Sequence, residues 1–521
     1  MKRRAFLHST AATLPLALSN VPVGVARSPL FEALLNDDSD RVLVLVQLNG
    51  GNDGLNSFVP LDQYDNLKSV RGNILPGRGT LLGIGSDLAF HPKLAGFRDV
   101  WQSGRMTAVQ GVGYPDQNRS HFRSTDIWNT ASPAEEVYTT GWLGRHFDRE
   151  YPGFPEGYPN RDASYPVAIT VGNGVTETCQ GLAGNFAITV DDPLNQGSIL
   201  QVEGGEETGG IYGDELAFVR TAIEQSNAYG RVIRDAAENG DTVARYPDDV
   251  FARRLSHVAR MISGGLRTKV YVVTLGGFDT HASQVVPGDP TAGEHAERLR
   301  RLGEGVAAFQ QDLRDLGVAD RVIGMTYSEF GRRIRSNAAY GTDHGTAAPA
   351  FLFGDCVNSG TIGANPVIDR DVDEQEGVAM QYDFRDLYGT ILEDWFGLRE
   401  SLIRDLLYQD YTRLGGIIAC SARPSGETSS TDDLAEDATA LAASPTAFRD
   451  EVALSFATAE PGRVRLDAFD VAGRHIETLF ARRLPAGSQR VTVDASAYPY
   501  GVVVFRLQQG SRVRTIRTIR G

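Results

Sequence analysis

The stretch from Arg41 to Pro60 constrains the fold most strongly, because an apolar run there passes directly into a glycine-rich polar turn. Six of the eight residues from Arg41 to Leu48 are Val or Leu. Such a continuous run predicts a parallel strand covered on both faces, since a strand with one wet face alternates polar and apolar residues. The turn carries Asp53 just past the strand's carboxyl end, where open α/β sheets place their ligands. Asp53 can serve as such a ligand or as an ordinary Asx-type turn residue.

Strand-like runs alternate with long amphipathic stretches from Arg41 to about Leu414, which is typical of a doubly wound α/β domain. Further strands are expected at Thr107 to Val112, Pro166 to Val171, Thr268 to Leu275, Arg321 to Tyr327 and Pro349 to Phe353. Helices are expected at Gly213 to Asn239, Asp248 to Ile262, Ala292 to Leu316 and Asp383 to Phe396. The glycine- and acid-rich piece from Asn195 to Gly210 is expected to be a surface insertion.

The two ends of the chain differ from this domain. Residues 1–26 combine a basic head with paired arginines, a short apolar stretch and a small-residue end, which resembles a twin-arginine export signal. Residues 421–444 are small, polar and acidic, and predict a disordered linker after a domain over residues 27–420. Residues 445–521 contain five short alternating strand-like runs separated by turns, which predict a small Ig-like β-sandwich.

Composition and missing motifs exclude several classes of protein. The formal net charge of -15 argues against a nucleic-acid partner, which needs a basic surface. No run beyond the signal reaches the ~18 apolar residues of a spanning helix, so none is expected in the mature protein. The three cysteines form no C-x-x-C pair, which disfavours a cysteine zinc site and leaves open one disulfide with one free thiol. Walker, G-x-S-x-G and H-E-x-x-H motifs are absent from the sequence.

A second polar cluster, Asn118 to Asp126, follows the strand expected at Thr107 to Val112. Ser120 lies near a helix start, where the positive end of the helix dipole stabilises an alkoxide or a phosphate. Ser120 can equally be a plain N-cap, with its hydroxyl bonded to the helix backbone.

A third cluster has two parts, each following an expected strand. Asp279 and His281 come after Thr268 to Leu275, while Glu329 and then the adjacent Asp343 and His344 come after Arg321 to Tyr327. Carboxylate and imidazole together suit zinc or manganese, whereas carboxylates alone favour calcium or magnesium. A lone histidine is usually a hydrogen-bonded structural residue, but two Asp-His pairs after successive strands predict a metal site.

Six motifs in this order resemble one known family. The segments LNGGNDGLN, NRSHFRSTDIW, GWLGRH, GGFDTH, SEFGRR and GTDHG are similar to the exported proteins catalogued as domain of unknown function 1501. That family is regarded as sulfatase-like within the alkaline phosphatase superfamily. The resemblance implies an alkaline phosphatase-like three-layer α/β/α fold with a mostly parallel sheet, and a metal and a nucleophile at the strand ends.

The resemblance also implies a role for each residue of the clusters. Ser120 would be the nucleophile on phosphorus or sulfur, Asp53 with Asp343 and His344 would hold one metal, and Asp279 with His281 would hold a second. The closing histidine of the family pattern is missing before His475, so His121, His91 or Glu329 could take its place, and Arg123 is a further candidate. Zinc is the first expectation for the divalent ion, with calcium and manganese as alternatives.

The last residues, from Ser444 to Gly521, resemble the C-terminal sorting domain of type IX secretion through DVAGR, LPAG, YGV and FRL. This implies export and sorting machinery as partners, passage through the periplasm, and a final location at the cell surface or outside the cell. A glycan-binding role for the sandwich is a separate possibility.

Together these features predict an exported metal-dependent hydrolase of phosphate or sulfate esters, acting on small molecules or on polymer-borne groups. The standard sulfatase signature, Cys or Ser with Pro two and Arg four residues later, is absent from the sequence. The alternative is a non-catalytic surface binding protein with a degenerate alkaline phosphatase-like site.

Overall fold

A computed structural model describes residues 40–151, 154–155, 157–160, 163–172, 174–195, 211–420, 441–444, 447–458, 461–470, 474–485, 487–509 and 512–520. The predicted signal over residues 1–26 lies outside the described residues. So do residues 196–210 of the predicted insertion and residues 421–440 of the predicted linker.

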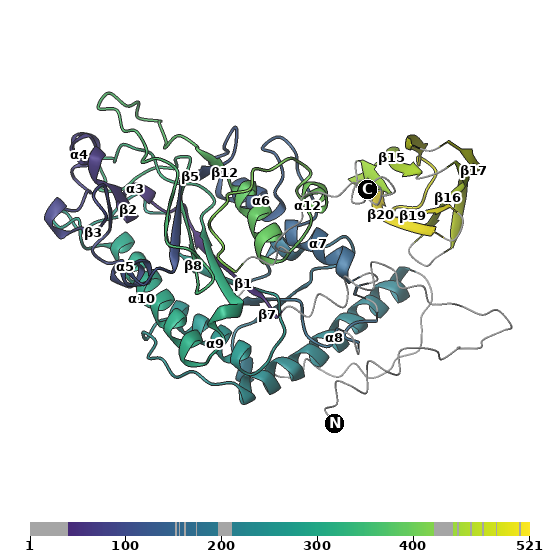
Figure 1. Ribbon diagram of the computed structural model, residues 1–521, viewed down its shortest axis with the longest axis horizontal. Coiled ribbons are helices and arrows are strands. Elements are labelled where there is room, and N and C mark those ends of the chain that lie inside the picture. Colours follow the sequence, from purple (N-terminus) through teal and green to yellow (C-terminus); the bar gives the residue numbers. More distant parts are fainter. Residues whose placement is uncertain are drawn as a thin grey trace. The chain divides into compact units, whose positions relative to one another are not determined.

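The α/β domain is built on one nine-stranded, mostly parallel sheet (Figure 1). Its strands are β1 (Val42–Asn49), β5 (Met106–Gly113), β6 (Ala168–Val171), β7 (Ala187–Val190), β8 (Val270–Gly276), β9 (Val322–Tyr327), β10 (Ala348–Phe353), β11 (Gly360–Ile362) and β12 (Tyr382–Asp383). The order across the sheet is β11-β5-β10-β9-β1-β8-β6-β7, with β12 also paired to β5. Of the described strands, β10 runs against both of its neighbours, while the remaining pairings are parallel. The predicted mostly parallel sheet is confirmed.

Strand β1 lies between β8 and β9 and is buried on both faces, as its sequence predicts. Val42, Val44 and Val46 belong to one hydrophobic core, whereas Leu43 and Leu45 belong to a second core on the opposite face. Alternate side chains of a strand point to opposite faces, so these two memberships show that helices cover both faces of the sheet. The domain therefore has three layers.

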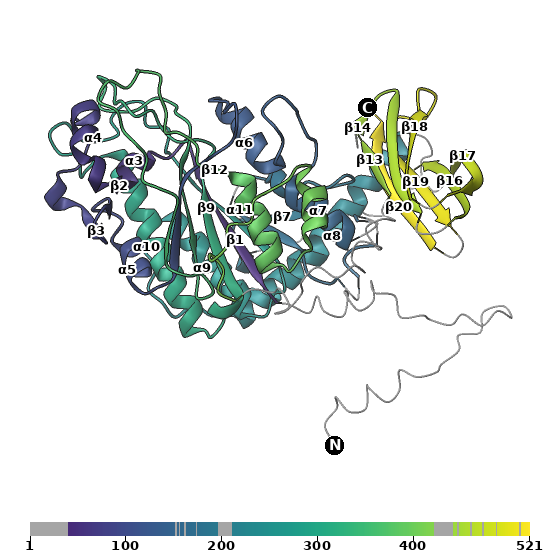
Figure 2. The same cartoon turned by 45° about the horizontal axis from the view of Figure 1, so that its top comes forward.

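Helices form two outer layers, one on each face of the sheet (Figures 1 and 2). One layer packs on the core that contains Val44, and it is formed by α5 (Ala95–Gln102), α8 (Ile211–Asn239), α9 (Val250–Ser263) and α10 (Glu294–Asp315). The other packs on the core that contains Leu43, and it is formed by α6 (His121–Thr130), α7 (Trp142–Glu150), α11 (Phe384–Thr390) with a π-turn at Ile391–Trp395, and α12 (Glu400–Leu407). The predicted helices correspond to α8, α9, α10 and α11 with its π-turn, while the shorter ones were not predicted.

A small side sheet and two short helices lie near the end of β1. The sheet joins β2 (Phe58–Pro60), β4 (Leu88–Phe90) and β3 (Leu82–Ile84), and the helices are α3 (Gly54–Ser57) and α4 (Tyr64–Arg71). Helix α4 carries Arg71, whose fully buried side chain forms an ion pair with Asp53.

The C-terminal part is a β-sandwich of two sheets. One sheet has the order β13-β15-β18 and the other β14-β20-β19-β16-β17. The strands are β13 (Ala442–Ser444), β14 (Ala447–Phe448), β15 (Glu451–Thr458), β16 (Gly462–Asp470), β17 (His475–Leu484), β18 (Gly487–Asp494), β19 (Gly501–Gln509) and β20 (Arg512–Arg520). Both sheets contribute to one core, with Leu454 from the first and Leu466 and Phe505 from the second. Strand β13 occupies the last residues of the predicted linker, and β17 was not predicted.

The cysteines adopt one of the arrangements that the sequence left open. Cys356 and Cys420 form a disulfide, and Cys179 is a buried free thiol whose pKa is raised by burial. Cys420 is the last described residue of the α/β domain, so the disulfide attaches this end of the domain to the segment that follows β10. Among the described residues, no helix is both long enough and apolar enough to cross a membrane.

Candidate metal centre

The predicted polar clusters meet at one edge of the sheet. Strands β1, β8 and β9 are parallel neighbours, so their carboxyl ends and the loops after them lie side by side. Gly50 shows how close these loops come, because it has a φ of 119° and a Cβ there would lie 2.4 Å from the Asp279 backbone nitrogen. Only glycine permits this approach together with this backbone conformation.

Three histidine rings and one carboxylate form the centre of the cluster. The ligand atoms of His121, Asp279 and His344 all lie within 4.8 Å of one another. His281 joins them, since its Nε2 is 2.9 Å from His344 Nε2 and 3.1 Å from Asp279 Oδ1. The sequence-predicted residues Asp279, His281 and His344 are therefore brought together, and His121 fills the place of the missing histidine.

Each of the three rings is held through its Nδ1 by an oxygen. His121 Nδ1 lies 2.8 Å from Glu329 Oε1, and His281 Nδ1 lies 2.7 Å from Asp343 Oδ1. His344 Nδ1 lies 2.8 Å from the Arg119 carbonyl oxygen, which can only accept a hydrogen bond. These contacts assign the proton of each neutral ring to Nδ1 and leave a lone pair on each Nε2.

The three Nε2 atoms thus point electron pairs into one small space beside the Asp279 carboxylate. Among the described residues, His121 Nε2 is buried without a hydrogen-bond partner, and the nearest carboxylate oxygen, Asp279 Oδ2, is 3.4 Å away. Such a nitrogen is costly unless a ligand satisfies it. Histidines whose second nitrogen is bound by a carboxylate or carbonyl are the usual form of metal-binding histidine. The donor set of this site therefore fits a divalent ion that accepts nitrogen and carboxylate ligands.

The charges of the site favour this protonation pattern for two of its groups. Burial lowers the pKa of His344, and the nearby Arg332 and His121 lower it further. Burial alone would raise the pKa of Asp279, but the hydrogen bond from Arg332 and the contact with His344 bring it to about 2. For His121 the hydrogen bond to Glu329 raises the pKa, against the effect of burial.

Asp53 does not join this cluster, which corrects its predicted role as the first metal ligand. Arg71 Nη1 donates to Asp53 Oδ1 at 2.8 Å and to Oδ2 at 3.0 Å, and Gln284 Nε2 donates to Oδ2 at 2.6 Å. Burial by itself would raise the pKa of Asp53, but Arg71, His295 and Gln284 together lower it. The carboxylate is already neutralised by the guanidinium of a helix that sequence reasoning did not predict.

Asp53 instead acts on the loops of the cluster indirectly, through a hydrogen bond from Gln284. Gln284 Oε1 accepts from the hydroxyls of Thr280 at 3.2 Å and Thr342 at 2.7 Å. Thr280 stands between Asp279 and His281 in the chain, and Thr342 precedes Asp343. Through Gln284, the buried Asp53 carboxylate therefore fixes the two loops that carry the cluster, and Asp53 is a positioning residue.

Arg332 is a second buried cation that sequence reasoning missed. Its Nε donates to Gly51 O at 2.7 Å, its Nη1 to Thr342 O at 2.7 Å, and its Nη2 to Asp279 Oδ1 at 2.7 Å. The side chain is fully buried and joins the turn after β1 to both cluster loops. The sequence signal that could have identified Arg332 was its position in the motif SEFGRR, three residues after Glu329.

The predicted assignment of ligands to two separate metals is also corrected. Asp343 orients His281 instead of joining Asp53, and His344 lies with Asp279. Glu329, proposed only as a substitute ligand, is a buried support that accepts from His121 and from Gly50 N at 2.8 Å.

Two further candidates lie away from the cluster. His91 is buried, and its Nδ1 accepts from Lys93 N at 3.1 Å, while burial and nearby His295 lower its pKa to about 3. Arg123 pairs with Asp126 and donates to the loop after α6, including Pro133 O at 2.8 Å. Both side chains are used for local structure, which the spacing of residues along the chain does not show.

Ser120 occupies the N-cap position of α6, at the edge of the cluster. Its carbonyl accepts from Ser124 N at 2.9 Å, but its hydroxyl makes no capping hydrogen bond. The residue before it supplies the carbonyl for His344, and the residue after it is His121. The exposed Ser120 side chain therefore stands between two residues that contact the three-histidine centre, and its hydroxyl makes no hydrogen bond to the described residues.

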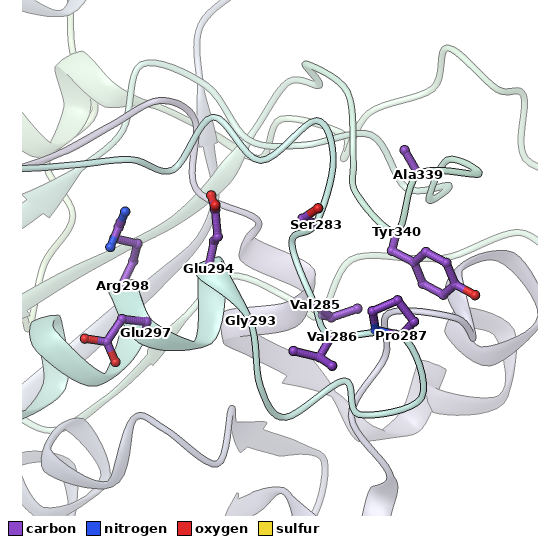
Figure 3. Close-up of a pocket in the computed structure, with 10 residues that line it drawn as sticks. All are labelled: Ser283, Val285, Val286, Pro287, Gly293, Glu294, Glu297, Arg298, Ala339 and Tyr340. Atoms are coloured by element: carbon purple, nitrogen blue, oxygen red, sulfur yellow. The ribbon is translucent and has the colours of Figure 1, made fainter.

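A pocket of about 530 Å³ lies beside this region and not at the centre itself (Figure 3). It is lined by Ser283, Val285, Val286, Pro287, Gly293, Glu294, Glu297, Arg298, Ala339 and Tyr340. None of the histidines or carboxylates of the cluster lines it. The pocket shares only the loops that follow His281 and precede Thr342.

Comparison with solved structures finds several distant likenesses. The PsFucS1 sulfatase from Pseudoalteromonas sp. is 9% identical with a TM-score of 0.33, over 90% of this chain and 88% of that one. A protein in the alkaline phosphatase superfamily from Vibrio parahaemolyticus is 10% identical with a TM-score of 0.31, over 92% and 82%. The phosphonate monoester hydrolase SpPMH from Silicibacter pomeroyi is 12% identical with a TM-score of 0.28, over 92% and 89%. Likenesses this weak carry no inference about chemistry.

Comparison by sequence is more decisive. No functionally curated protein matches the chain. Residues 79–400 match the family described as protein of unknown function (DUF1501), and this span is more than half of the 521 residues. The span includes every residue of the three-histidine cluster and the serine beside it. The chain belongs to the DUF1501 family.

Proposed function

We propose that this protein is a metal-dependent hydrolase of phosphate or sulfate esters with Ser120 as its nucleophile. One observation carries the proposal: the Nε2 atoms of His121, His281 and His344 converge on the Asp279 carboxylate while each Nδ1 is held by an oxygen. Structural histidines rarely turn three free lone pairs toward one another, because nothing then offsets their repulsion.

The residues that would hold the ion are the three histidines and Asp279. Imidazole nitrogen with carboxylate oxygen favours zinc, with manganese as an alternative, and calcium fits this nitrogen-rich set least well. Glu329, Asp343 and the Arg119 carbonyl orient the rings. Because Asp53 is neutralised by Arg71 and Asp279 also binds Arg332, the geometry favours one ion over the two that the family resemblance implies.

Bound there, a divalent ion supplies charge stabilisation for an ester oxygen and lowers the pKa of a nearby hydroxyl. Ser120 provides that hydroxyl, at the N-terminus of a ten-residue helix whose dipole favours negative charge. His344 and His121 fix the backbone on either side of Ser120, so the hydroxyl keeps a constant place relative to the centre. A rigid nucleophile and a charged centre are the two parts that ester hydrolysis needs.

The proposal is tested with purified mature protein on aryl phosphate, phosphodiester and aryl sulfate substrates, with zinc, manganese or calcium added. Ser120→Ala should abolish turnover while keeping bound metal, whereas Asp279→Asn should lose both. Ser69→Ala, an exposed serine on α4, is the matched control and should change neither. Turnover that survives Ser120→Ala unchanged would remove the serine from the mechanism.

A non-catalytic binding protein is the second candidate function. The diversion of Asp53 to Arg71 favours it, because a carboxylate that the family resemblance assigns to a metal is unavailable here. This candidate predicts binding of anionic esters without turnover under any metal condition.

We also propose that the chain is exported and reaches the cell surface or the medium. The disulfide between Cys356 and Cys420 supports an oxidising compartment. The compact sandwich over residues 441–520 supports a separate sorting domain for the export machinery. Deleting residues 1–26 should keep the protein in the cytoplasm, and deleting residues 445–521 should stop it in the periplasm. Loss of ligand binding after the second deletion would instead favour a glycan-binding sandwich.

A further inference from the structure

Two arginines, Arg119 and Arg333, border the metal centre, and His344 connects them. His344 Nδ1 donates to the Arg119 carbonyl at 2.8 Å, and Arg333 Nε donates to the His344 carbonyl at 3.3 Å. His344 therefore contacts the backbone of Arg119 and the side chain of Arg333. Their side chains are half-buried, so they can be reached from outside the protein.

These two guanidinium groups are poorly satisfied compared with the other arginines nearby. Arg119 has a single hydrogen bond, from Nη1 to Gln375 O at 2.7 Å, and no carboxylate partner among the described residues. Arg333 Nη1 lies 3.5 Å from Asp343 Oδ2, but the other oxygen of that carboxylate is taken by His281. By contrast, Arg71 and Arg332 are fully buried and use all of their nitrogens on protein acceptors.

The two charges also act on each other. Burial lowers the pKa of Arg119, and the positive charge of Arg333 lowers it further. Two cations that repel each other, with N–H groups left over, form a favourable place for an anion with several oxygens. The chain as a whole is strongly acidic, with a formal net charge of -15, so two neighbouring arginines of this kind are not part of a general basic trend.

The charge balance of the site indicates which anion fits. Three guanidinium groups (Arg119, Arg332 and Arg333) match three carboxylates (Asp279, Glu329 and Asp343), so the protein charges cancel. One divalent ion then leaves two positive charges. A phosphate monoester carries about two negative charges above its second pKa of ~6, whereas a sulfate ester or a phosphodiester carries one.

We propose that Arg119 and Arg333 bind the non-bridging oxygens of a dianionic phosphate monoester, and that this pair makes the site prefer such esters over sulfate esters and phosphodiesters. The inference rests on the function proposed above and names the substrate class of the same site. Both arginines are specificity-determining residues, because they contact the group that is transferred.

The experiment measures binding instead of turnover, so that it separates this inference from the proposed function. Calorimetry at about pH 8 follows phenyl phosphate, phenyl sulfate and a methyl phenyl phosphate diester binding to the zinc-loaded Ser120→Ala protein. We expect phenyl phosphate to bind at least about tenfold more tightly than the other two, as one hydrogen-bonded charge is worth ~1.5 kcal/mol or more. The measurement is repeated without metal, which gives the part of the phenyl phosphate affinity that the arginines contribute alone.

Arg119→Gln and Arg333→Gln are each introduced into the Ser120→Ala protein. Each should weaken the binding of phenyl phosphate about tenfold and the binding of phenyl sulfate only slightly. Arg119→Lys keeps the charge but loses the fork of donors, and should fall between wild type and glutamine. Arg335→Gln is the matched control, because its guanidinium donates to Val372 O and Arg370 O, away from the centre. Metal content and the circular dichroism spectrum show that each variant folds.

Three outcomes decide the matter. Loss of the phosphate preference in both glutamine variants, with the control unchanged, supports the inference even if no ester is hydrolysed. Equal affinity for phenyl phosphate and phenyl sulfate in the parent protein overturns it. Unchanged phosphate binding in Arg119→Gln and Arg333→Gln also overturns it, and leaves the proposed hydrolase intact if esters are turned over.

Discussion

The Nε2 atoms of His281 and His344 lie 2.9 Å apart, although each ring already donates its Nδ1 proton to an oxygen. Two neutral rings in this arrangement would direct lone pairs at each other. The contact becomes favourable if a proton or a cation lies between the nitrogens, and the Asp279 carboxylate 3.1 Å from both adds further attraction for a cation. The relationship between these two histidines is therefore the main structural reason to expect a metal.

The buried pair of Asp53 and Arg71 should be important for stability. Asp53→Asn leaves the fully buried Arg71 guanidinium without its counter-charge, and we expect a loss of about 3 kcal/mol in the free energy of unfolding. Urea denaturation followed by circular dichroism measures it. Asp65→Asn, at an exposed position on the same helix, should change stability by less than about 0.5 kcal/mol. Equal stability of both variants would show that the pair is not needed for folding.

The same pair predicts a pH dependence. The folded-state pKa of Asp53 is lowered below its usual value of 3.8, so its contribution to stability is fully present above pH 3.8 and is lost as the pH falls from there through the lowered folded-state pKa. The difference in unfolding free energy between wild type and Asp53→Asn should therefore be constant from pH 7 to about pH 4 and shrink only below pH 3.8. A difference that already shrinks between about pH 7 and pH 5 would contradict the assignment.

His146 should make the α/β domain sensitive to mild acid. Burial, with Arg149 and Lys269 adding to it, lowers the pKa of His146 to about 3, so its 3.2 Å contact with Glu150 is a neutral hydrogen bond and not an ion pair. The unfolded chain takes up this proton near pH 6.5, before the folded protein does. Stability should fall by up to about 1.4 kcal/mol per pH unit between pH 6.5 and 3 from this group alone. In His146→Gln this part of the slope should disappear.

The disulfide predicts a definite thiol count and a stability effect. Unfolded protein should show one reactive thiol, from Cys179, and three after reduction. The bridge joins residues 64 apart, so in the chain-entropy account its removal by Cys356→Ser with Cys420→Ser costs about 4 kcal/mol. A mass shift on alkylation gives the count, and three thiols before reduction would contradict the bridge.

The sequence predicted the longer strands of the sheet because they carry a strong signal, whereas the short strands β7, β11 and β12 were not predicted. The unbroken apolar run in β1 could only be a strand buried on both faces, and the opposite core memberships of Leu43 and Val44 confirm it. Weak elements were missed for a physical reason. Strand β17 has mostly exposed or half-exposed residues and lacks a clear alternation, and helix α6 gains its stability from packing and not from a distinct apolar stripe.

The sequence predicted where the candidate site lies, but not the contacts that its individual residues make. Strand ends located Asp279, His281 and His344 correctly, because parallel neighbours bring their following loops to one edge. The direction in which Asp53 points depends on Arg71, eighteen residues away on a short helix, and no local pattern encodes that contact. The importance of His121 depends likewise on Glu329, 208 residues away, whose carboxylate turns the ring toward the centre.

Metal analysis of the folded, purified mature protein is the sharpest test of a metal site at the three histidines. We expect mass spectrometry to find close to one zinc or manganese ion per chain. That ion should be lost in His344→Ala and in His281→Ala, and it should be kept in folded Asp53→Asn protein. The three histidines do not form a metal site if the protein binds no divalent ion under any loading condition, or if Asp53→Asn loses the ion while His344→Ala keeps it.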